Sequence, residues 1–432
     1  MKLTDPEKAL RDGSEGPAVA AAMDLLVRYG EALGAERLVD TNNVCGTVGA
    51  TMPFLRDFAQ GPGGMDAVFS EFSLDSSTVH AIPKVKVPSS HLQLGLDPEH
   101  AERQGIGAEV VKVYRQGEAY AGKLGVQPLN TCTPYLVGNV PVRGEHCAWM
   151  ESSAVIYINA VLGARTNAEG RESAGAAMLT GKIPYWGLHI EANRSATHLI
   201  EVDIDVKTTA DWGLLGYWVG EQVQESIPAF VGSNGGALPI TPNLARLKHF
   251  GAAAASSGGV EIYHMVGITP EAPTLEEALG RKKPKVMLRY GEAERRHAYE
   301  LVNTTAKDSA VDYVMLGCPH YSMEQIWEAC QLLEGQKVHA NSALWIFTPR
   351  AIKQMADQAG YTKIIEEAGG HLMSDTCSAL GRVIPKGTKV AAVDSAKQAH
   401  YLPAIMGIQC WFGTTAECIQ AAVTGRWTGG LR

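Results

Sequence analysis

The sequence contains no C-x-x-C pair, although it has eight cysteines among 432 residues. Zinc ribbons and thioredoxin-like redox motifs use such pairs and are therefore excluded. The sequence also lacks an apolar run long enough to span a bilayer, so no membrane association is expected. The N-terminal segment MKLTDPEKALRDGSEG is polar and acidic, unlike a secretory signal or a transit peptide. We therefore expect a cytoplasmic protein whose cysteines stay reduced.

Basic residues are in the minority, with 38 Lys and Arg against 46 Asp and Glu, which gives a formal net charge of −8. A nucleic-acid-binding protein would show a basic patch or stripe, so no nucleic-acid partner is expected. The hydrophobic content of 45% and the charged content of 19% are typical of a globular protein. A chain of this length predicts two or three domains.

The hydrophobic pattern changes along the chain. Residues 145–165 are apolar and rich in small side chains, which predicts a buried helix, and residues 196–220 predict a strand followed by a helix. The charged, proline-bearing segment 269–286 predicts a boundary between an N-terminal α/β region, 1–275, and a C-terminal α/β domain, 286–432. In the C-terminal domain, strand and helix patterns alternate. That alternation predicts parallel sheets flanked by helices.

Two cysteines follow segments that we predict to be strands. Cys318 follows VDYVMLG, and Cys377 follows HLMSDT. Ligands of open parallel sheets gather at the carboxyl ends of strands, so both thiols are expected where such a domain does its chemistry. Ser322 is a predicted N-cap with Gln325 at the capping-box position, which aims a helix N-terminus at this region. Lys397, after the predicted strand AAVDS, suits a carboxylate or phosphate.

A third cysteine, Cys132, lies in PLNTCTPYLVGNVP. Three thiolates from distant segments suit an iron–sulfur cluster, although each cysteine alone could also be a buried small hydrophobe. With three protein thiolates, one iron of a four-iron cluster keeps an open position and can act as a Lewis acid on a substrate hydroxyl. Loss of water from a β-hydroxy carboxylate needs such help, because hydroxide is a poor leaving group and the α-hydrogen is weakly acidic.

Several segments resemble the large, catalytic part of the aconitase X family: NTCTPYLVGNVPVRGEHCAWMESSAVIYINAVLGARTN, PYWGLH, LGCPHYS, DTC and DSAKQAHYLP. The similarity runs nearly end to end. It implies an aconitase-like multi-domain α/β fold with the active site in the interdomain cleft, and hydro-lyase activity. It also implies that Cys132, Cys318 and Cys377 ligate an iron–sulfur cluster, whether [4Fe-4S], [3Fe-4S] or [2Fe-2S]. A small swivelling-domain subunit, which contributes a serine near the substrate, is the implied partner.

Known activities of the family are dehydration of cis-3-hydroxy-L-proline in bacteria and of mevalonate 5-phosphate in archaea. The present sequence departs from the expected pattern in VCGTVGA, in FSLDSST and at Ser378. These departures count most against mevalonate 5-phosphate, whose phosphate and hydroxyls those loops would hold. We expect cis-3-hydroxy-L-proline as the substrate. The alternatives are mevalonate 5-phosphate dehydration, a zinc or mononuclear-iron hydrolase that uses the same loops, and a subunit that carries a cluster only as a scaffold.

Glu151 and Lys397 are the predicted catalytic groups; the alternative for Glu151 is a helix cap. The predicted substrate-binding residues come from two N-terminal loops, from the segment after Glu151 and from the Cys318 loop: Gly46, Thr47, Val48, Asp75, Ser76, Ser152, Ser153, Asn159, Arg165 and His320.

Four of these interpretations remain open. Arg165 either binds a carboxylate or forms a structural ion pair. His320 either carries a proton or is a buried histidine with satisfied hydrogen bonds. Cys45 is a fourth ligand, a substrate-site thiol or a core cysteine. The remaining four cysteines are predicted to be structural residues on helical segments: Cys147, Cys330, Cys410 and Cys418.

Overall fold

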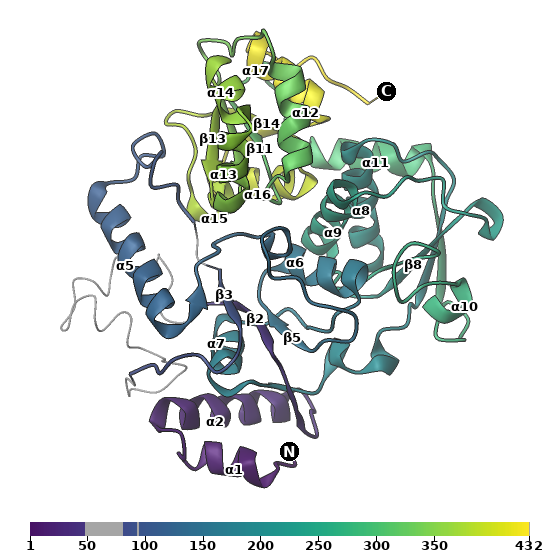
Figure 1. Ribbon diagram of the computed structural model, residues 1–432. Helices are drawn as coiled ribbons and strands as arrows, with labels where there is room; N and C mark the ends of the chain where they lie inside the picture. The colour runs from purple at the N-terminus through teal and green to yellow at the C-terminus, as the bar shows by residue number, and fades with distance from the viewer. Residues whose placement is uncertain (48–80, 93–94, 432) are drawn as a thin grey trace.

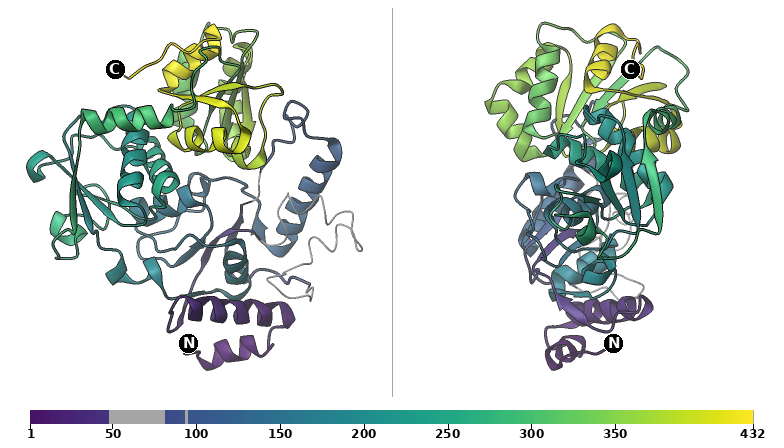
Figure 2. Two further views of the ribbon diagram at one scale, coloured as in Figure 1. Left: turned by 180° about the vertical axis from the view of Figure 1, so that it is seen from behind. Right: turned by 90° about the vertical axis from the view of Figure 1, so that its right-hand side faces the viewer.

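The computed structural model describes residues 1–47, 81–92 and 95–431. Within them the chain forms three α/β units, each built around a parallel sheet (Figure 1). The first unit runs from α1 to η4, the second from β7 to α11 and the third from β11 to α17. Views from behind and from the side show the third unit, in yellow and green, seated above the other two (Figure 2).

The first unit has a four-stranded parallel sheet with the strand order β4-β3-β2-β5 and a separate antiparallel pair of β1 and β6. Its strands are β1 (Leu38–Asp40), β2 (Asn43–Gly46), β3 (Ser89–His91), β4 (Val126–Gln127), β5 (Cys147–Trp149) and β6 (Lys182–Pro184). Its helices are α1 (Asp5–Arg11), α2 (Pro17–Ala32), α5 (Ala108–Leu124), α6 (Ser152–Tyr157) and α7 (Arg171–Thr180). Helix α7 packs on β2, and α2 packs on α7.

The second unit has the strand order β10-β7-β8-β9, with every pair parallel. Its elements are β7 (His198–Val202), α8 (Thr209–Val223), β8 (Pro228–Gly232), α9 (Leu244–Gly258), β9 (His264–Met265), α10 (Leu275–Ala278), β10 (Val286–Tyr290) and α11 (Glu292–Val302). The predicted strand and helix in residues 196–220 are confirmed. The predicted division at 275–286 stays a prediction; the strand that follows it, β10, pairs with β7.

The third unit has a five-stranded parallel sheet with the order β13-β12-β11-β14-β15. Its strands are β11 (Tyr313–Leu316), β12 (Ala343–Thr348), β13 (His371–Ser374), β14 (Val390–Val393) and β15 (Gln409–Phe412). Its helices are α12 (Met323–Leu333), α13 (Arg350–Gln358), α14 (Tyr361–Glu367), α15 (Ser378–Gly381), α16 (Ala396–Met406) and α17 (Thr415–Thr424). The predicted alternation of strands and helices is confirmed, and so is the capping box of Ser322 and Gln325.

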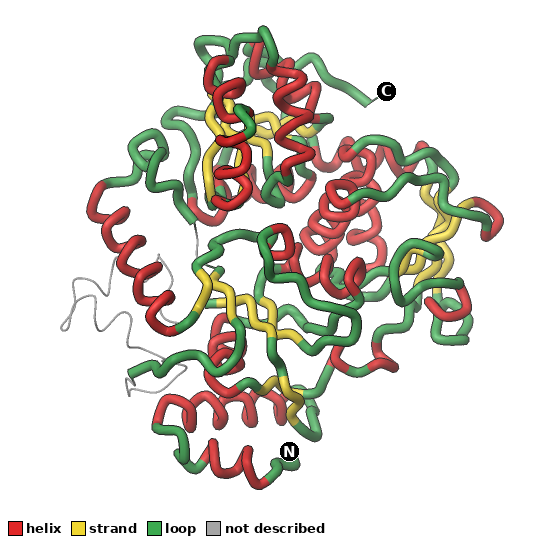
Figure 3. The backbone as a smooth tube through the Cα atoms, viewed as in Figure 1, coloured by secondary structure: helices red, strands yellow, loops and turns green. Residues whose placement is uncertain are grey.

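Short helical turns complete the loops. They are η1 (Pro134–Leu136), η2 (Ile158–Leu162), η3 (Gly187–His189), η4 (Glu191–Asn193) and η5 (Ser233–Gly235), of which η2 is a π-helical turn that continues α6. Figure 3 shows loops, in green, that run between the sheets.

The predicted helix over 145–165 is only partly correct. Cys147 lies in β5, where it pairs with Asn43 of β2, and the helix begins at Ser152. Cys410 likewise lies in a strand, β15, whereas Cys330 and Cys418 lie in helices as predicted. Short apolar runs that are buried on both faces have the same composition in a strand and in a helix, so periodicity did not separate them.

Each of the three parallel sheets contains a point where the strand order reverses. In the first sheet it falls between β2 and β5, and in the third between β11 and β14. The crevice outside the carboxyl ends of the strands at such a point is the usual ligand site of an open α/β sheet. Thr47 and Glu151 follow β2 and β5, while Cys318 and Lys397 follow β11 and β14. The topology therefore places the predicted catalytic residues at two such points.

One apolar core joins the three units. It includes Trp149 of the first unit, Phe250 of the second and Phe347 of the third, all buried. Because these side chains belong to one packed cluster, the units hold their facing loops in a fixed relation. None of the helices among the described residues is long and apolar enough to cross a membrane.

Helices α8 and α9 approach closely through glycines. A methyl group at Gly216 would lie 2.3 Å from the Phe250 carbonyl oxygen, whereas one at Gly213 would lie 3.6 Å from its nearest neighbours, in ordinary contact. We expect Gly216→Ala to lower the thermal unfolding midpoint, since overpacking costs about 1–3 kcal/mol. Gly213→Ala, on the same helix, is the matched control and should leave the midpoint unchanged or raise it. Equal midpoints for the two variants would contradict the close packing.

Candidate active site

Three cysteines approach one another on loops that follow β4, β11 and β13. Burial raises the pKa of each thiol, to about 11 at Cys318. At Cys132, the Glu151 carboxylate and then the Cys318 thiol raise the pKa further, and Cys377 has the same effect on Cys318. Cys318 is therefore within electrostatic range of both other thiols, while the role of the three cysteines as ligands stays a prediction.

His320 connects the three cysteine loops. Its Nδ1 lies 2.8 Å from Oγ1 of Thr131, its Nε2 lies 2.8 Å from the carbonyl oxygen of Thr376, and its backbone N–H donates to Sγ of Cys132 at 3.4 Å. Because a carbonyl oxygen only accepts, Nε2 carries the proton and Nδ1 accepts from the Thr131 hydroxyl. Burial lowers the pKa of His320 to about 4, so the ring is neutral. Both ring nitrogens are thus occupied by the chain itself.

Glu151 and Lys397 form a half-buried ion pair beside the thiols. Lys397 Nζ donates to Glu151 Oε1 at 2.6 Å and to Ser153 Oγ at 3.3 Å, and each charged side chain is 13% exposed. Burial alone would lower the pKa of Lys397, but the Glu151 carboxylate and the Cys318 thiol raise it well above its usual range. The ammonium is therefore charged at neutral pH.

Glu151 also caps a helix. Its Oε2 accepts from the backbone N–H of Ala154 at 2.7 Å and from Oγ of Ser153 at 2.6 Å at the start of α6, while Ser152 is half-buried in the same turn. The helix-cap role considered for Glu151 is therefore confirmed, while its catalytic role stays a prediction; its other oxygen faces Lys397.

Gln398, next to Lys397 on α16, donates from Nε2 to Sγ of Cys318 at 3.1 Å. This contact crosses the reversal point between β11 and β14. Sequence reasoning missed Gln398, although it lies inside the segment DSAKQAHYLP, which was singled out for its lysine.

A loop of the first unit supports the Cys377 loop. Asp97 Oδ2 accepts from the backbone N–H of Ser374 at 2.8 Å, and Gln104 Nε2 donates to Oγ1 of Thr376 at 2.9 Å. A methyl group at Gly95 would lie 1.6 Å from the carbonyl oxygen of Asp375, so only glycine fits there. These contacts were not foreseen, because each joins residues more than 260 positions apart in the sequence.

The predicted substrate loops are described only in part. Gly46 ends β2, and Thr47 places Oγ1 3.0 Å from Nε2 of the buried His91. Cys45, in β2, is 1% exposed, and burial raises its pKa to about 12. Three other predicted residues lie outside the described residues: Val48, Asp75 and Ser76.

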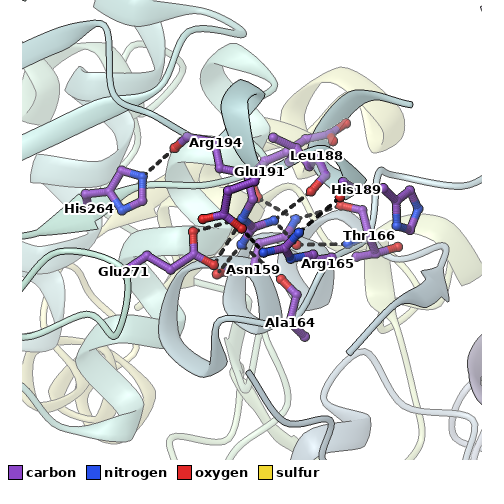
Figure 4. Close-up of polar contacts among 11 residues, drawn as sticks. Asn159, Ala164, Arg165, Thr166, Leu188, His189, Glu191, Arg194, His264 and Glu271 are labelled. Carbon is purple, nitrogen blue, oxygen red and sulfur yellow. Dashed lines mark hydrogen bonds and ion pairs between the residues drawn. The ribbon is translucent and has the colours of Figure 1, made fainter. Parts of the chain in front are cut away.

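Asn159 and Arg165 belong to a polar cluster around Arg194 (Figure 4). Asn159 donates from Nδ2 to the carbonyl oxygens of Thr166 and Glu261 at 2.8 and 3.0 Å. Arg165 pairs with Glu191, and Arg194 pairs with Glu271 at 2.8 Å. Among the described residues, none of these hydrogen-bond and ion-pair partners of Asn159 and Arg165 is a cysteine or Lys397. The Glu191 side chain is exposed, so this pair is not the buried ion pair considered as the structural alternative for Arg165, and the binding of a carboxylate by Arg165 stays a prediction.

The arrangement of the three cysteines bears on which kind of metal group they could bind. Within residues 1–47, 81–92 and 95–431, no group of three or more His, Cys, Asp or Glu side chains is arranged to hold one metal ion. In an iron–sulfur cluster each thiolate binds its own iron, so the thiols need not converge on one ion. Three separate thiols can therefore hold a cluster, and a zinc or mononuclear-iron centre stays the alternative.

Comparisons with known proteins agree with this geometry. Family models match in order along the chain: the aconitase X first domain over residues 1–192, the second over 196–300 and the third over 311–424. A phosphomevalonate dehydratase large subunit of Methanocaldococcus jannaschii is 36% identical, over 97% of this chain and 100% of that protein. A cis-3-hydroxy-L-proline dehydratase of Hypocrea jecorina is 33% identical, over 98% of this chain and 69% of that protein.

Among solved structures, the holo-form of Thermococcus kodakaraensis aconitase X superposes with a TM-score of 0.79 at 30% sequence identity, over 98% of this chain and 100% of that one. The chain belongs to the aconitase X family. It is a hydro-lyase, a dehydratase of the aconitase X type.

The ion pair generates a stability prediction. Glu151→Ala removes the cap of α6 and leaves the Lys397 ammonium without its partner, which we expect to cost about 3 kcal/mol. Glu151→Gln keeps an acceptor for the cap and should lie between this variant and the wild type. Ser152→Ala, in the same turn, is the control. Thermal unfolding midpoints measure the three effects, and an unchanged midpoint for Glu151→Ala would show that the pair is not formed.

Proposed function

We propose that the chain is the large subunit of an iron–sulfur dehydratase that removes water from cis-3-hydroxy-L-proline. The observation that carries the proposal is the approach of three thiols from two units to a paired carboxylate and ammonium. Thiolates are the usual ligands of iron–sulfur clusters, while a carboxylate and an ammonium can bind the charged groups of a small substrate.

The residues present fit a cluster held by Cys132, Cys318 and Cys377. Hydrogen bonds from His320 N–H and Gln398 Nε2 reach two of the sulfurs, as is usual around cluster thiolates. Burial disfavours free thiolates at this position, and metal ligation offsets that cost. When bound, a cluster with an open iron position supplies a Lewis acid that polarises the substrate hydroxyl.

Glu151 and Lys397 would act on the other half of the substrate. The substrate carboxylate binds Lys397 Nζ and replaces Glu151 Oε1 there. The freed Glu151 Oε1 would then accept the α-hydrogen as a proton, the carbon–oxygen bond at the β-carbon would break, and a double bond would form between the two carbons. The hydroxide that leaves takes up one proton and departs as water, so the net change is the loss of one water molecule. The Ser153 hydroxyl and the Ala154 N–H stay on Oε2 and fix the orientation of the carboxylate.

Charge balance supports an amino-acid substrate. The charges of Glu151 and Lys397 cancel, and a zwitterion enters such a site without a change in net charge. Mevalonate 5-phosphate would bring its phosphate and its carboxylate close to thiolates that are already negative. Two ammonium groups act on the thiols, that of Lys397, which is paired with Glu151, and that of Lys248, which is buried behind the loops.

Mevalonate 5-phosphate is the second candidate. The observation that favours it is the match to large subunits of phosphomevalonate dehydratases, one of them at 36% identity over its full length. The hydroxyproline enzyme is 33% identical, and this chain spans 69% of it. The phosphomevalonate dehydratase relatives are named large subunits, which also supports a separate small swivelling-domain partner for this chain.

If the three cysteines hold a cluster, substitution of any one of them should remove most of the bound iron. We expect anaerobically purified wild-type protein to contain iron and acid-labile sulfide, and Cys132→Ser, Cys318→Ser and Cys377→Ser each to lose most of both. Cys330→Ala, which removes a buried thiol of α12, is the matched control and should keep them. A colourless wild-type protein that contains zinc and no sulfide would refute the cluster.

The substrate is tested by co-expression with the small subunit under anaerobic conditions. We expect turnover of cis-3-hydroxy-L-proline, and we expect Lys397→Met to reduce kcat/KM by about 100-fold or more, because the carboxylate loses its ionic partner. Lys182→Met, which removes a lysine of the first unit that pairs with Glu7 and Asp40, is the matched control and should leave turnover unchanged. Turnover of mevalonate 5-phosphate alone would replace the proposed substrate with the second candidate.

A further inference from the structure

A buried lysine lies behind the cysteine loops and has no place in the chemistry described above. Lys248, on α9 of the second unit, is 0% exposed. Its Nζ donates to the carbonyl oxygens of Pro319, at 3.3 Å, and of His320, and to Oε1 of Gln325 at 2.6 Å. All three donor hydrogens of the ammonium therefore have acceptors within the protein.

These acceptors belong to one segment. Pro319 and His320 directly follow Cys318, and Gln325 is the capping-box residue of α12. The lysine thus ties the second unit to the loop that delivers Cys318 and to the histidine that connects the other two cysteine loops. A buried ammonium is costly, and it is retained where several polar groups compensate it.

The charge of Lys248 also acts on the sulfurs. Burial lowers its pKa to about 8, while electrostatic interactions with Cys132, Asp394 and Cys318 counter that shift. The carbonyl contacts and the electrostatic coupling both point toward the thiol site, although Lys248 is not hydrogen-bonded to a cysteine.

We propose that Lys248 is a positioning residue of the thiol site, which fixes the Pro319–His320 backbone and places a positive charge behind the Cys132 and Cys318 sulfurs. The inference rests on the proposed function in one respect, since the charge acts on a cluster held by those sulfurs. Reduction of a cluster adds negative charge, so a nearby cation favours the reduced state and raises the midpoint potential.

Two substitutions separate the two effects. Lys248→Met keeps the length of the side chain and removes both charge and donors, whereas Lys248→Gln keeps two donors without the charge. In metal-free protein, we expect Lys248→Met to speed alkylation of Cys318 by iodoacetamide roughly tenfold, because three buried acceptors lose their donor and the loop opens more often. In reconstituted protein, both variants should shift the midpoint potential to more negative values.

Lys182→Met is the matched control. Lys182 is a partly buried lysine of the first unit that pairs with Glu7 and Asp40, so its loss tests stability without touching the thiol site. It should change neither the alkylation rate nor the potential. If Lys248→Met does not fold, Lys248→Gln carries the prediction of the potential shift.

These experiments distinguish a failure of the proposed function from a failure of the proposed role of Lys248. Wild-type protein without a cluster would refute the proposed function, while the alkylation rates of metal-free protein would still test the inference. Wild-type protein with a cluster, together with Lys248 variants of unchanged potential and unchanged alkylation rate, would refute the role of Lys248. A lower melting temperature with both readouts unchanged would show a structural role only.

Discussion

The site depends on holding three irregular loops against one another. Cys132, Cys318 and Cys377 lie outside strands, so no ladder of backbone hydrogen bonds fixes their sulfurs. His320 supplies the missing constraint, since its ring and its backbone N–H join Thr131, Thr376 and the Cys132 sulfur. A protonated ring would lose the acceptor at Nδ1, and burial keeps the ring neutral. The same histidine is therefore poorly suited to carry a proton in the reaction.

All three units contribute to this arrangement. The first provides Cys132, Glu151 and the loop of Asp97, the third provides Cys318, Cys377 and Lys397, and the second provides Lys248. The Glu151–Lys397 contact joins residues 246 positions apart. Such contacts are stable only because one apolar core is shared by the units and keeps their strand ends facing each other. A change in the relative position of the units would separate the sulfurs and the ion pair together.

The sequence predicted some of this and missed the rest, for identifiable reasons. Alternating strand and helix patterns located the third sheet, and strand ends located Cys318 and Cys377, because parallel sheets expose their carboxyl ends in one place. Cys132 follows a strand of only two residues, β4, and could be assigned only through the family resemblance. Lys248 lies in the helix LARLKHFGAAAASSG, where nothing local distinguishes a buried lysine from a solvated one.

Sequence patterns also failed to predict hydrogen bonds between side chains and residues that are far away in the sequence. Gln104 and Asp97 hold the Cys377 loop through single hydrogen bonds across the units, and no periodicity reports such contacts. Arg165 was open to two interpretations, because an arginine in an apolar segment binds a ligand or a buried carboxylate equally well. It pairs with the exposed carboxylate of Glu191, so its role stays a prediction. Capping boxes, by contrast, are local, and that of Ser322 and Gln325 was predicted correctly.

The central claim is that the sulfurs of residues 132, 318 and 377 hold one iron-containing group between the first and third units. Anomalous diffraction at the iron absorption edge, from crystals of anaerobically prepared protein, tests it most directly. We predict a single iron peak that lies in contact with all three sulfurs. Iron bound elsewhere, or a fully loaded crystal in which one of the three sulfurs lies away from the peak, would contradict the account.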